Sequence, residues 1–257
     1  MYPFLAYIKF LCSSTNQHGV HSPFVYDLLT KSLYKKEQHI KYLVLKKYRE
    51  TLKKSSDTIE VTDFGAGSRV FSSNKRKVAR IAKHVGISKK RQKLLFKLTY
   101  YFKPKECLEL GTSLGMATAA MSLANPESNI TTVEGCPSTA NFTASLFKDF
   151  KLQNIELVNA TFKYFFSSEG FKKNYDFIYV DGNHDKEKTI SYFEILLSRV
   201  HNNSIIIFDD IYWSKPMTEA WKYIYSHPKV TVSIDTFQWG IIFFRKEQPK
   251  QHFKIRV

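Results

Sequence analysis

Strand-like and helix-like segments alternate along the second half of this chain, and this alternation constrains its fold more than any other feature. Short apolar runs, rich in β-branched residues, are each followed by a longer segment with apolar residues at helical spacing. Such alternation is typical of βαβ units, whose strands run parallel. We expect strands at 107–111, 130–135, 155–160, 175–182 and 204–210, and helices at 115–124, 138–150, 161–169, 186–200 and 215–226.

The end of the chain departs from this pattern. The runs "KVTVSIDT" (229–236) and "FQWGIIFFR" (237–245) follow each other directly. A parallel crossover needs a dozen or more residues, so these runs must form an antiparallel hairpin. We therefore expect an α/β fold with a doubly wound, mostly parallel seven-stranded sheet that ends in this hairpin. The sheet would form a domain at 104–257, preceded by a basic, mainly helical region at 1–103.

A glycine-containing bend joins the first expected strand to its helix, in "ELGTSLGMATAA" (109–120). A loop that holds an adenosine cofactor leaves a buried strand, opens a helix, and is followed about 20 residues later by an acid at the next strand end. Gly111 and Gly115 allow close approach of the backbone, and a helix start offers N–H groups. Glu134 ends the next strand and could accept hydrogen bonds from both ribose hydroxyls. An ordinary strand–helix turn is the alternative.

A second glycine pair, in "VTDFGAGSRV" (61–70), fails the same test. No second apolar strand follows it, and no acid stands about 20 residues further on. We interpret it as a structural turn that closes a short strand near 59–64. Contact of its amides with a phosphate or a substrate is the alternative.

Three aspartates follow the fourth and fifth expected strands: Asp181, Asp209 and Asp210. The carboxyl ends of adjacent parallel strands face the ligand crevice of a doubly wound sheet, so we expect these acids to converge. Clustered carboxylates repel one another unless a cation or a proton intervenes, and oxygen ligands suit Mg²⁺. The alternative is that Asp181 contacts the cofactor or caps the next helix, while the other two accept hydrogen bonds from loop amides.

Two further polar residues follow Asp181 in "DGNHD". His184 is a candidate base for removing a proton from an acceptor molecule, or else a residue that only hydrogen-bonds the loop. Asp185 stands immediately before the helical segment "KEKTISYF", where an aspartate is a favoured N-cap.

The segments "LELGTSLG", "VEG", "YVDGNHD" and "IIIFDDIYW", in this order and spacing, resemble the class I S-adenosylmethionine-dependent methyltransferases. The variant is that of the small-molecule O-methyltransferases of the catechol and macrocin type, over residues 105–245. The resemblance implies S-adenosyl-L-methionine as cofactor and, in the metal-dependent members, Mg²⁺ held at positions that match Asp181, Asp209 and Asp210. A bound metal there would orient a diol-like acceptor and lower the pKa of its hydroxyl group.

The resemblance also assigns cofactor contacts. Glu109, Gly111 and Gly115 would line the methionine end of the cofactor, Glu134 with Gly135 its ribose, and the segment around Ala160 its adenine. Thr112, Ser113 and Leu114 stand where many relatives have a further glycine. Of these, Thr112 and Ser113 are included among the candidate cofactor-binding residues, as is Asp181.

The formal net charge of +16 lies entirely in the first part of the chain. Residues 1–103 carry 22 Lys and Arg against 6 Asp and Glu, whereas residues 104–257 carry 17 of each. This asymmetry indicates a boundary near residue 103. It also indicates an anionic partner, such as a nucleic acid, a phospholipid surface or a negatively charged substrate. The alternative is a basic helical surface that is only solvated. Three cysteines without metal-site spacing favour free thiols and a cytoplasmic protein, and no run is apolar enough for a membrane span.

The basic region contains its own signals. Ser22 and Pro23 indicate a helix start, with His18 and His21 nearby either as substrate contacts or in packing and capping roles. The stretch 78–98 has the pattern of a helix-turn-helix, but its leucines at 94, 95 and 98 also fit the core face of a helix that leads into the first sheet strand.

The leading hypothesis is therefore a methyltransferase that acts on a hydroxyl of a small or carrier-linked acceptor, with a small-molecule or anionic acceptor as its substrate. An RNA- or DNA-directed methyltransferase is the first alternative, and a nucleic-acid-binding protein on a methyltransferase fold is the second. Against the first, "YVDGNHD" stands where amino-methylating nucleic-acid enzymes carry an Asn/Asp-Pro-Pro-aromatic motif.

Overall fold

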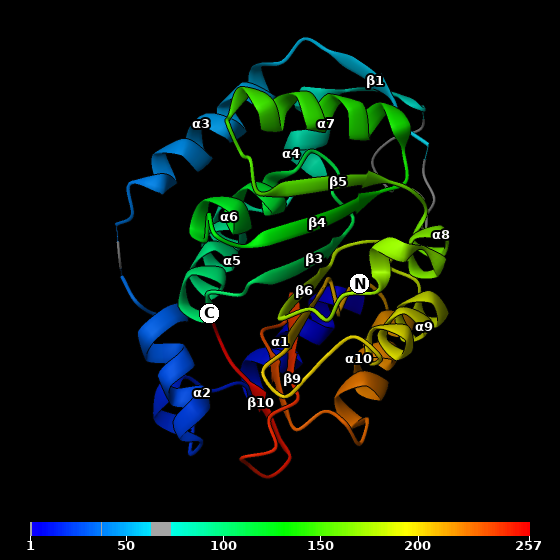
Figure 1. Cartoon of the computed structure of the whole chain (residues 1–257). Helices are drawn as coiled ribbons and strands as arrows, with labels where there is room; N and C mark the ends of the chain where they lie inside the picture. Colours follow the sequence, from blue (N-terminus) through cyan, green and yellow to red (C-terminus); the bar gives the residue numbers. More distant parts are fainter. Residues whose placement is uncertain (1, 37, 63–72) are drawn as a thin grey trace. The chain divides into compact units, whose positions relative to one another are not determined.

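The computed structural model describes residues 2–36, 38–62 and 73–257. Its strands have the topology of a mostly parallel eight-stranded sheet with antiparallel strands towards the C-terminus, flanked by helices, which confirms the predicted fold class (Figure 1). The chain divides into two compact units. We call residues 36–171 the glycine-loop unit, and residues 1–35 together with 172–257 the aspartate unit.

Three parallel strands form the sheet of the glycine-loop unit: β3 (Glu106–Leu110), β4 (Asn129–Glu134) and β5 (Ile155–Asn159). β4 pairs with both neighbours, and Leu108 aligns with Thr131 across the first pair. Helices α6 (Met116–Ala124) and α7 (Pro137–Asp149) connect them, and α8 (Phe162–Ser167) and a short 3₁₀ turn (Glu169–Phe171) follow β5. All these strands and helices lie where the alternating pattern predicts them.

The front part of this unit is helical, as predicted. It contains α3 (Lys41–Lys54), α4 (Val78–His84) and α5 (Lys89–Phe102), and both α3 and α5 pack on α6. Leu94, Leu95 and Leu98 are buried, so the helix before β3 presents them to the core as expected. A small antiparallel pair, β1 (Thr58–Glu60) and β2 (Lys75–Lys77), connects α3 to α4.

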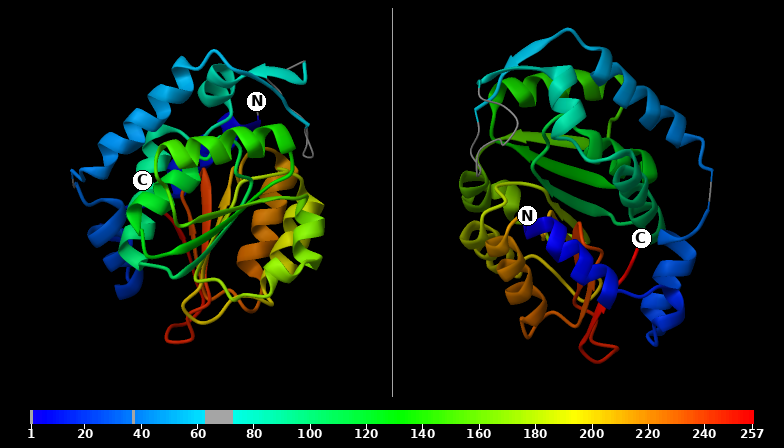
Figure 2. Two further views of the ribbon diagram at one scale, coloured as in Figure 1. Left: turned by 45° about the horizontal axis from the view of Figure 1, so that its top comes forward. Right: turned by 180° about the vertical axis from the view of Figure 1, so that it is seen from behind.

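The aspartate unit contains the other five strands: β6 (Phe177–Val180), β7 (Ile205–Asp209), β8 (Val232–Asp235), β9 (Trp239–Phe243) and β10 (Gln251–Lys254). β6 and β7 are parallel, whereas β9 is antiparallel to both β7 and β8, which confirms the predicted hairpin. Helices α9 (Lys186–Leu196) and α10 (Lys215–Ser226) lie side by side (Figure 2).

The prediction of seven strands misses β10, which pairs in parallel with the edge of β8. Its sequence "QHFK" is polar and none of its residues is buried, so it lacks the apolar run from which the other sheet strands were recognised. The bridge between Thr15 and Ile255 continues this edge towards the N-terminus of the chain.

The N-terminal part of the aspartate unit consists of α1 (Tyr2–Ser13), a 3₁₀ turn (Gln17–Gly19), α2 (Pro23–Leu28) and a π-helical turn (Leu29–Leu33). Ser22 caps α2 through a hydrogen bond from the Val25 amide to its Oγ, and Pro23 is the first helical residue, as predicted. Within the described residues, no helix combines the length and apolar character needed to cross a membrane.

The two compact units do not follow the predicted boundary near residue 103, because residues 36–103 group with the strands that follow them. The predicted boundary near residue 103 marks where the charge of the chain changes. Whether it also separates two domains stays a prediction. Cys12, Cys107 and Cys136 are not joined in a disulfide bond, as expected.

Candidate functional site

The bend between β3 and α6 requires its two glycines. Gly111 and Gly115 have φ angles of 104° and 68°, in the left-handed region that favours glycine. The amides of Gly111 and Thr112 both donate to the carbonyl oxygen of Val133, at 3.0 and 3.3 Å, so the bend is tied to the end of β4. Ser113, also with a positive φ of 47°, lies at the tip.

Gly115 is required for space as well. A Cβ atom there would lie 2.4 Å from a ring carbon of Phe147 and 2.7 Å from the hydroxyl of Tyr48. The same hydroxyl donates to the carbonyl oxygen of Leu114 at 2.9 Å, so α3 contacts the loop from behind. α6 then starts without any side-chain cap, which leaves its first-turn amides suited to an anionic or polar ligand.

Glu134 lies at the end of β4, and backbone amides fix its orientation. Its Oε2 accepts from the amide of Ser113 and its Oε1 from the amide of Cys136, both at 2.9 Å. These two bonds fix the orientation of the carboxylate at the end of the strand. The acid that the sequence assigns to a ribose is thus bonded directly to the glycine bend.

The start of the loop after β5 lies beside Glu134. The amide of Ala160 donates to the carbonyl oxygen of Glu134 at 3.0 Å, and the Nδ2 of Asn159 donates to the carbonyls of Glu134 and Gly135, at 2.8 and 3.4 Å. The segments that the resemblance assigns to ribose and adenine are therefore hydrogen-bonded to each other.

Glu109 is fully buried in β3 beneath this loop. Its Oε2 accepts hydrogen bonds from the hydroxyls of Thr118 and Thr132, whereas its Oε1 has no hydrogen-bond partner among the described residues. Burial raises the pKa of Glu109 to about 7, although the two hydroxyl bonds act in the opposite direction. A buried carboxyl oxygen without a partner is uncommon and is consistent with a polar group of a ligand nearby.

The glycine-loop unit therefore fits an adenosine cofactor in three respects. It has a backbone cradle that a Cβ would fill at Gly115, an uncapped helix start, and a carboxylate held in place at Glu134. Sequence reasoning identified Gly111, Gly115 and Glu134 but missed the supporting side chains of Tyr48 and Phe147. Neither Tyr48 nor Phe147 lies near the bend in the sequence, so only their size and aromatic character could have indicated this role.

In the aspartate unit, Asp209 ends β7 and is almost completely buried. Its Oδ2 accepts from the hydroxyl of Tyr179 at 2.6 Å, and its Oδ1 accepts from the amide of Asp210 at 2.7 Å. The Tyr179 hydroxyl also lies 3.5 Å from Oδ2 of Asp181, so the predicted convergence of Asp181 and Asp209 takes place around a tyrosine. Tyr179 precedes Asp181 by two positions, so the alternation of a strand places both side chains on the same face, and this spacing is visible in the sequence.

The three aspartates do not form a metal centre in the part of the chain that the structure describes. Both oxygens of Asp209 accept hydrogen bonds, and Asp210 has a left-handed φ of 53° that turns the chain after β7. Among the described residues, no three His, Cys, Asp or Glu side chains are placed to share a metal ion. Mg²⁺ binding by Asp181, Asp209 and Asp210 stays a prediction from the sequence.

His184 lies in the turn after β6, with its Nε2 3.8 Å from Oδ1 of Asp181 and its ring 5.7 Å from that of Trp213. Its side chain is about one-quarter exposed, so a small molecule can reach it. Asp185 caps α9 by accepting from the amide of Lys188 at 3.0 Å, which confirms the predicted N-cap.

Other sequence candidates lie elsewhere. His18 and His21 are exposed on the surface of the aspartate unit. Gly65 and Gly67, the second glycine pair, lie outside the described residues, although β1 confirms a short strand near residue 59. The stretch with a helix-turn-helix pattern corresponds to α4 and α5, and the leucines of α5 are buried in the glycine-loop unit, as the alternative of a core helix predicts.

Comparison with known proteins agrees with this geometry. Residues 108–211 match the sequence model of a family described as "Methyltransferase domain". No curated protein sequence matches the chain. Similar solved structures include the S-adenosylhomocysteine-bound methyltransferase PaMTH1 of Podospora anserina, with 14% identity, a TM-score of 0.60, and 88% of this chain and 98% of that chain covered.

Two further solved structures have comparable similarity. The O-methyltransferase of Bacillus cereus in complex with SAH is 16% identical, with a TM-score of 0.56 and coverage of 87% of this chain and 96% of that chain. TomG of Streptomyces achromogenes, an O-methyltransferase of tomaymycin synthesis in complex with SAM, is 16% identical, with a TM-score of 0.54 and coverage of 63% and 82%. Residues 108–211 are thus similar to a methyltransferase domain, and the chain has the fold of these methyltransferase structures.

Proposed function

We propose that this protein is an S-adenosylmethionine-dependent methyltransferase that methylates a hydroxyl group of a small or carrier-linked acceptor. The observation that carries the proposal is the arrangement of Glu134, whose two oxygens are held by the amides of Ser113 and Cys136 beside the Gly111–Gly115 bend. This arrangement presents a fixed carboxylate to a sugar diol next to an uncapped helix start. The cofactor, when bound, supplies an electrophilic methyl group on a sulfonium sulfur.

The residues of the chain contribute binding and orientation. Glu134 binds the ribose hydroxyls, the bend approaches the methionine end with its backbone, and Glu109 provides a buried acceptor there. Methyl transfer is an in-line displacement, so alignment of the acceptor oxygen with the methyl carbon supplies much of the rate. The proposal assigns no role to Mg²⁺.

We further propose that His184 takes the proton of the acceptor hydroxyl, with Asp181 as a positioning residue. His184 is partly exposed, and its Nε2 lies 3.8 Å from the Asp181 carboxylate, which favours the protonated imidazole formed in the reaction. This pair lies in the same loop as Asn183, whose amide group donates to the hydroxyl of Tyr192 and thereby helps to hold the turn.

Calorimetry with S-adenosylmethionine tests the cofactor assignment. Each hydrogen bond to a charged group contributes about 1.5–3 kcal/mol, so Glu134→Gln should weaken binding about 100-fold. Glu156→Gln is the matched control, because it removes an exposed carboxylate from the neighbouring strand β5 and should leave affinity within about twofold. Absence of binding by the wild-type protein, or equal affinity of Glu134→Gln, would refute the assignment.

Incubation with radiolabelled S-adenosylmethionine and a cell extract identifies the class of acceptor. We expect label in a fraction that survives nuclease treatment and contains a methylated hydroxyl. Label that nucleases remove would instead establish a nucleic-acid acceptor and overturn the proposal.

With the acceptor in hand, His184→Gln should lower turnover about 100-fold and leave cofactor affinity unchanged, since general base catalysis contributes about 10²–10⁴-fold. His201→Gln is the matched control, because His201 forms a comparable pair with Asp176 at 2.9 Å in the same unit. Equal effects of the two substitutions would exclude a catalytic role for His184.

A further inference from the structure

The basic residues of α3 and α5 gather on facing stripes of the two helices. Residues 42, 45, 46, 49, 50 and 53 of α3 follow helical spacing and share one face, and so do residues 89, 92 and 93 of α5. The ammonium group of Lys93 lies 4.7 Å from the centre of the Tyr42 ring, and the rings of Tyr42 and Phe96 are 4.9 Å apart. The two stripes therefore meet along a shared cleft.

This basic cleft is lined by Tyr42, Leu45, Lys46, Arg49, Glu50, Lys53, Lys89, Gln92 and Lys93. Five of the nine side chains are cations and only one is a carboxylate, so the cleft has a strongly positive potential. The carboxylate, Glu50, is exposed and pairs with Lys46 at 3.7 Å. Among the described residues, Lys53 and Lys89 have no acidic partner.

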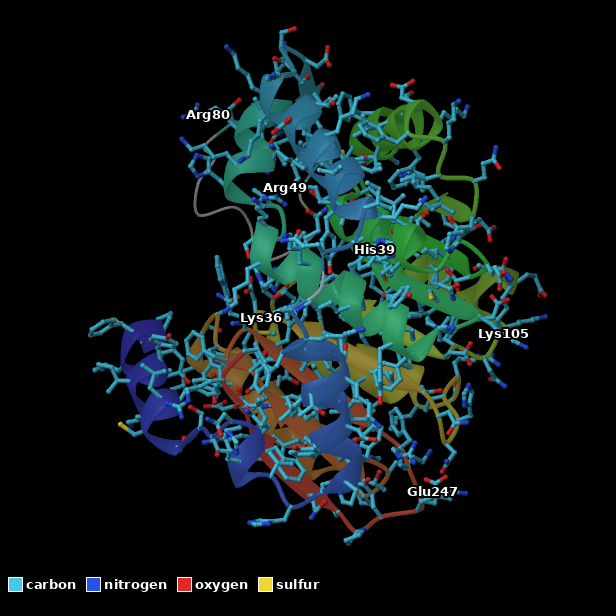
Figure 3. The ribbon with its side chains drawn as sticks, turned by 90° about the vertical axis from the view of Figure 1, so that its left-hand side faces the viewer. Lys36, His39, Arg49, Arg80, Lys105 and Glu247 are labelled. Atoms are coloured by element: carbon cyan, nitrogen blue, oxygen red, sulfur yellow. The ribbon has the colours of Figure 1, made fainter. Side chains whose placement is uncertain are left out.

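Arg49 lies half-buried on α3, and hydrogen bonds hold its guanidinium group in the cleft (Figure 3). Its Nη1 donates to the carbonyl oxygen of Ile87 at 2.7 Å and lies 3.4 Å from Oε1 of Gln92, which is itself 1% exposed. Its Nε and Nη2 have no hydrogen-bond partner among the described residues. Partial burial lowers the pKa of Arg49. One nitrogen thus anchors the guanidinium and leaves two others to bind a ligand.

The cavity has a volume of about 150 Å³, equivalent to about five water molecules. Drug-sized ligands occupy pockets of about 300 Å³ or more, so the volume of this open cavity suits a compact group better. A guanidinium with two adjacent donors binds phosphate oxygens in pairs, and the surrounding lysines add point charges. We propose that the basic cleft is a binding site for a diphosphate group, with Arg49 as its anchor and Lys53 and Lys89 at its rim.

This site differs from the proposed cofactor site. S-adenosylmethionine carries no phosphate, and the residues assigned to it are Gly111, Gly115 and Glu134. Gln92 connects the two regions, because its Nε2 donates to the carbonyl oxygen of Met116 in the first turn of α6 at 2.7 Å. Removal of Arg49 could therefore disturb the glycine bend, so rim lysines make the better test.

Calorimetry with inorganic pyrophosphate at about 0.15 M salt tests the proposal. We expect binding to the wild-type protein at or below about 1 mM, and about tenfold weaker binding to the double variant Lys53→Gln/Lys89→Gln. The matched control is Lys47→Gln/Lys54→Gln, which removes the same charge from exposed positions of α3 outside the cleft and should change affinity by no more than about twofold.

A substitution in the opposite direction strengthens the test. Glu50→Gln removes the only carboxylate of the cleft and should tighten pyrophosphate binding about two- to fivefold, because it relieves repulsion at partly screened distances. Thermal unfolding of every variant verifies that each remains folded. S-adenosylmethionine affinity, measured in parallel, should be the same for all of them, so failure of this proposal and failure of the proposed function are distinguishable.

The source of the diphosphate is resolved by further ligands. Equal affinity for pyrophosphate and ADP indicates that the diphosphate alone is recognised, whereas tighter binding of ADP indicates a nucleotide, and both results support the site. No pyrophosphate binding at about 1 mM, or equal losses in the rim and control variants, would overturn it. A short RNA that competes with pyrophosphate and loses affinity equally in the rim and control double variants would also overturn the proposal. Such a result would show that the basic surface binds anions without a defined site.

Discussion

The carboxylates of Glu134 and Asp209 are held in two different ways, although each lies at the carboxyl end of a strand and each has both oxygens hydrogen-bonded. Glu134 accepts from two backbone amides, those of Ser113 and Cys136. Asp209 accepts from one backbone amide and from the hydroxyl of Tyr179. The site in the glycine-loop unit is thus fixed by the course of the main chain, and the site in the aspartate unit also depends on a particular side chain.

This difference predicts which substitutions damage each site. Main-chain donors are lost only when the backbone moves, so the glycine-loop site should be sensitive to backbone conformation and tolerant of many side-chain changes. The aspartate site should respond to the loss of a single hydroxyl group. We therefore expect the largest effect from a backbone change at the glycine bend and smaller effects from single side chains.

Gly115→Ala should have the largest effect. The new Cβ would contact Phe147 and the Tyr48 hydroxyl at 2.4–2.7 Å, in a backbone conformation that disfavours side chains. Strain of about 1–2 kcal/mol and overpacking of about 1–3 kcal/mol together predict a loss of about 2–5 kcal/mol in unfolding free energy, measured by denaturant titration, with loss of cofactor binding. Gly170→Ala, where the nearest atoms lie at 3.4 Å, is the control and should cost less than about 1 kcal/mol.

Glu109 should make the stability of the protein depend on pH. Its pKa is about 7 when folded and 4.5 in the reference state, so the folded protein retains a proton that the unfolded chain releases. Stability from this group is complete below pH 4.5 and decreases as the pH rises through 7, by about 3 kcal/mol in total. Glu109→Gln mimics the protonated form and should remove most of this decrease. A wild-type protein and a variant with parallel pH profiles would contradict the prediction.

Tyr179→Phe should destabilise the protein by about 1–3 kcal/mol, because it removes the hydroxyl that donates to the buried Oδ2 of Asp209. Cofactor affinity should hardly change. Tyr223→Phe is a suitable control, since its hydroxyl donates to Glu194 at a solvent-exposed position and should contribute less than about 0.5 kcal/mol. If Tyr179→Phe reduced the free energy of S-adenosylmethionine binding by more than it reduced the free energy of unfolding, the proposed difference between the two sites would be wrong.

Asp185→Ala should have the smallest effect, about 1 kcal/mol of unfolding free energy, because it removes the N-cap of α9. Asp185→Asn should retain nearly all of the stability, since asparagine caps equally well. Both variants should retain turnover once the acceptor is known, unlike His184→Gln. A large loss of turnover in Asp185→Asn would assign Asp185 to the site rather than to the helix.

Much of the fold could be predicted from the sequence because its strands are apolar and its helices periodic. Ile205–Asp209 reads as a buried strand, and α9 begins after an obvious capping residue. β10 escaped prediction because a short polar edge strand is recognisable only by its partner β8. Residues 36–103 were grouped by their charge, whereas the structure groups them by packing with the strands that follow.

The candidate site was predictable to the extent that local geometry demands particular residues. Gly115 is recognisable because only glycine fits that bend, and Glu134 because a strand must end there. The contact of Tyr48 with the Leu114 carbonyl spans 66 positions and leaves no local signal. The type and position of the three aspartates predict metal ligands, but they do not reveal that the Tyr179 hydroxyl and the Asp210 amide donate to the oxygens of Asp209.

The hydrogen bond from Tyr48 to the Leu114 carbonyl has a practical consequence for anyone who shortens this protein. A fragment that began at residue 104, where the charge changes, would contain every cofactor motif but would lack the tyrosine behind the bend. Helix α6 of such a fragment would also lose its packing against α3 and α5. A fragment for crystallisation or ligand screening should therefore begin at residue 36 or earlier. The glycine bend and the helices that support it are encoded in different stretches of the gene.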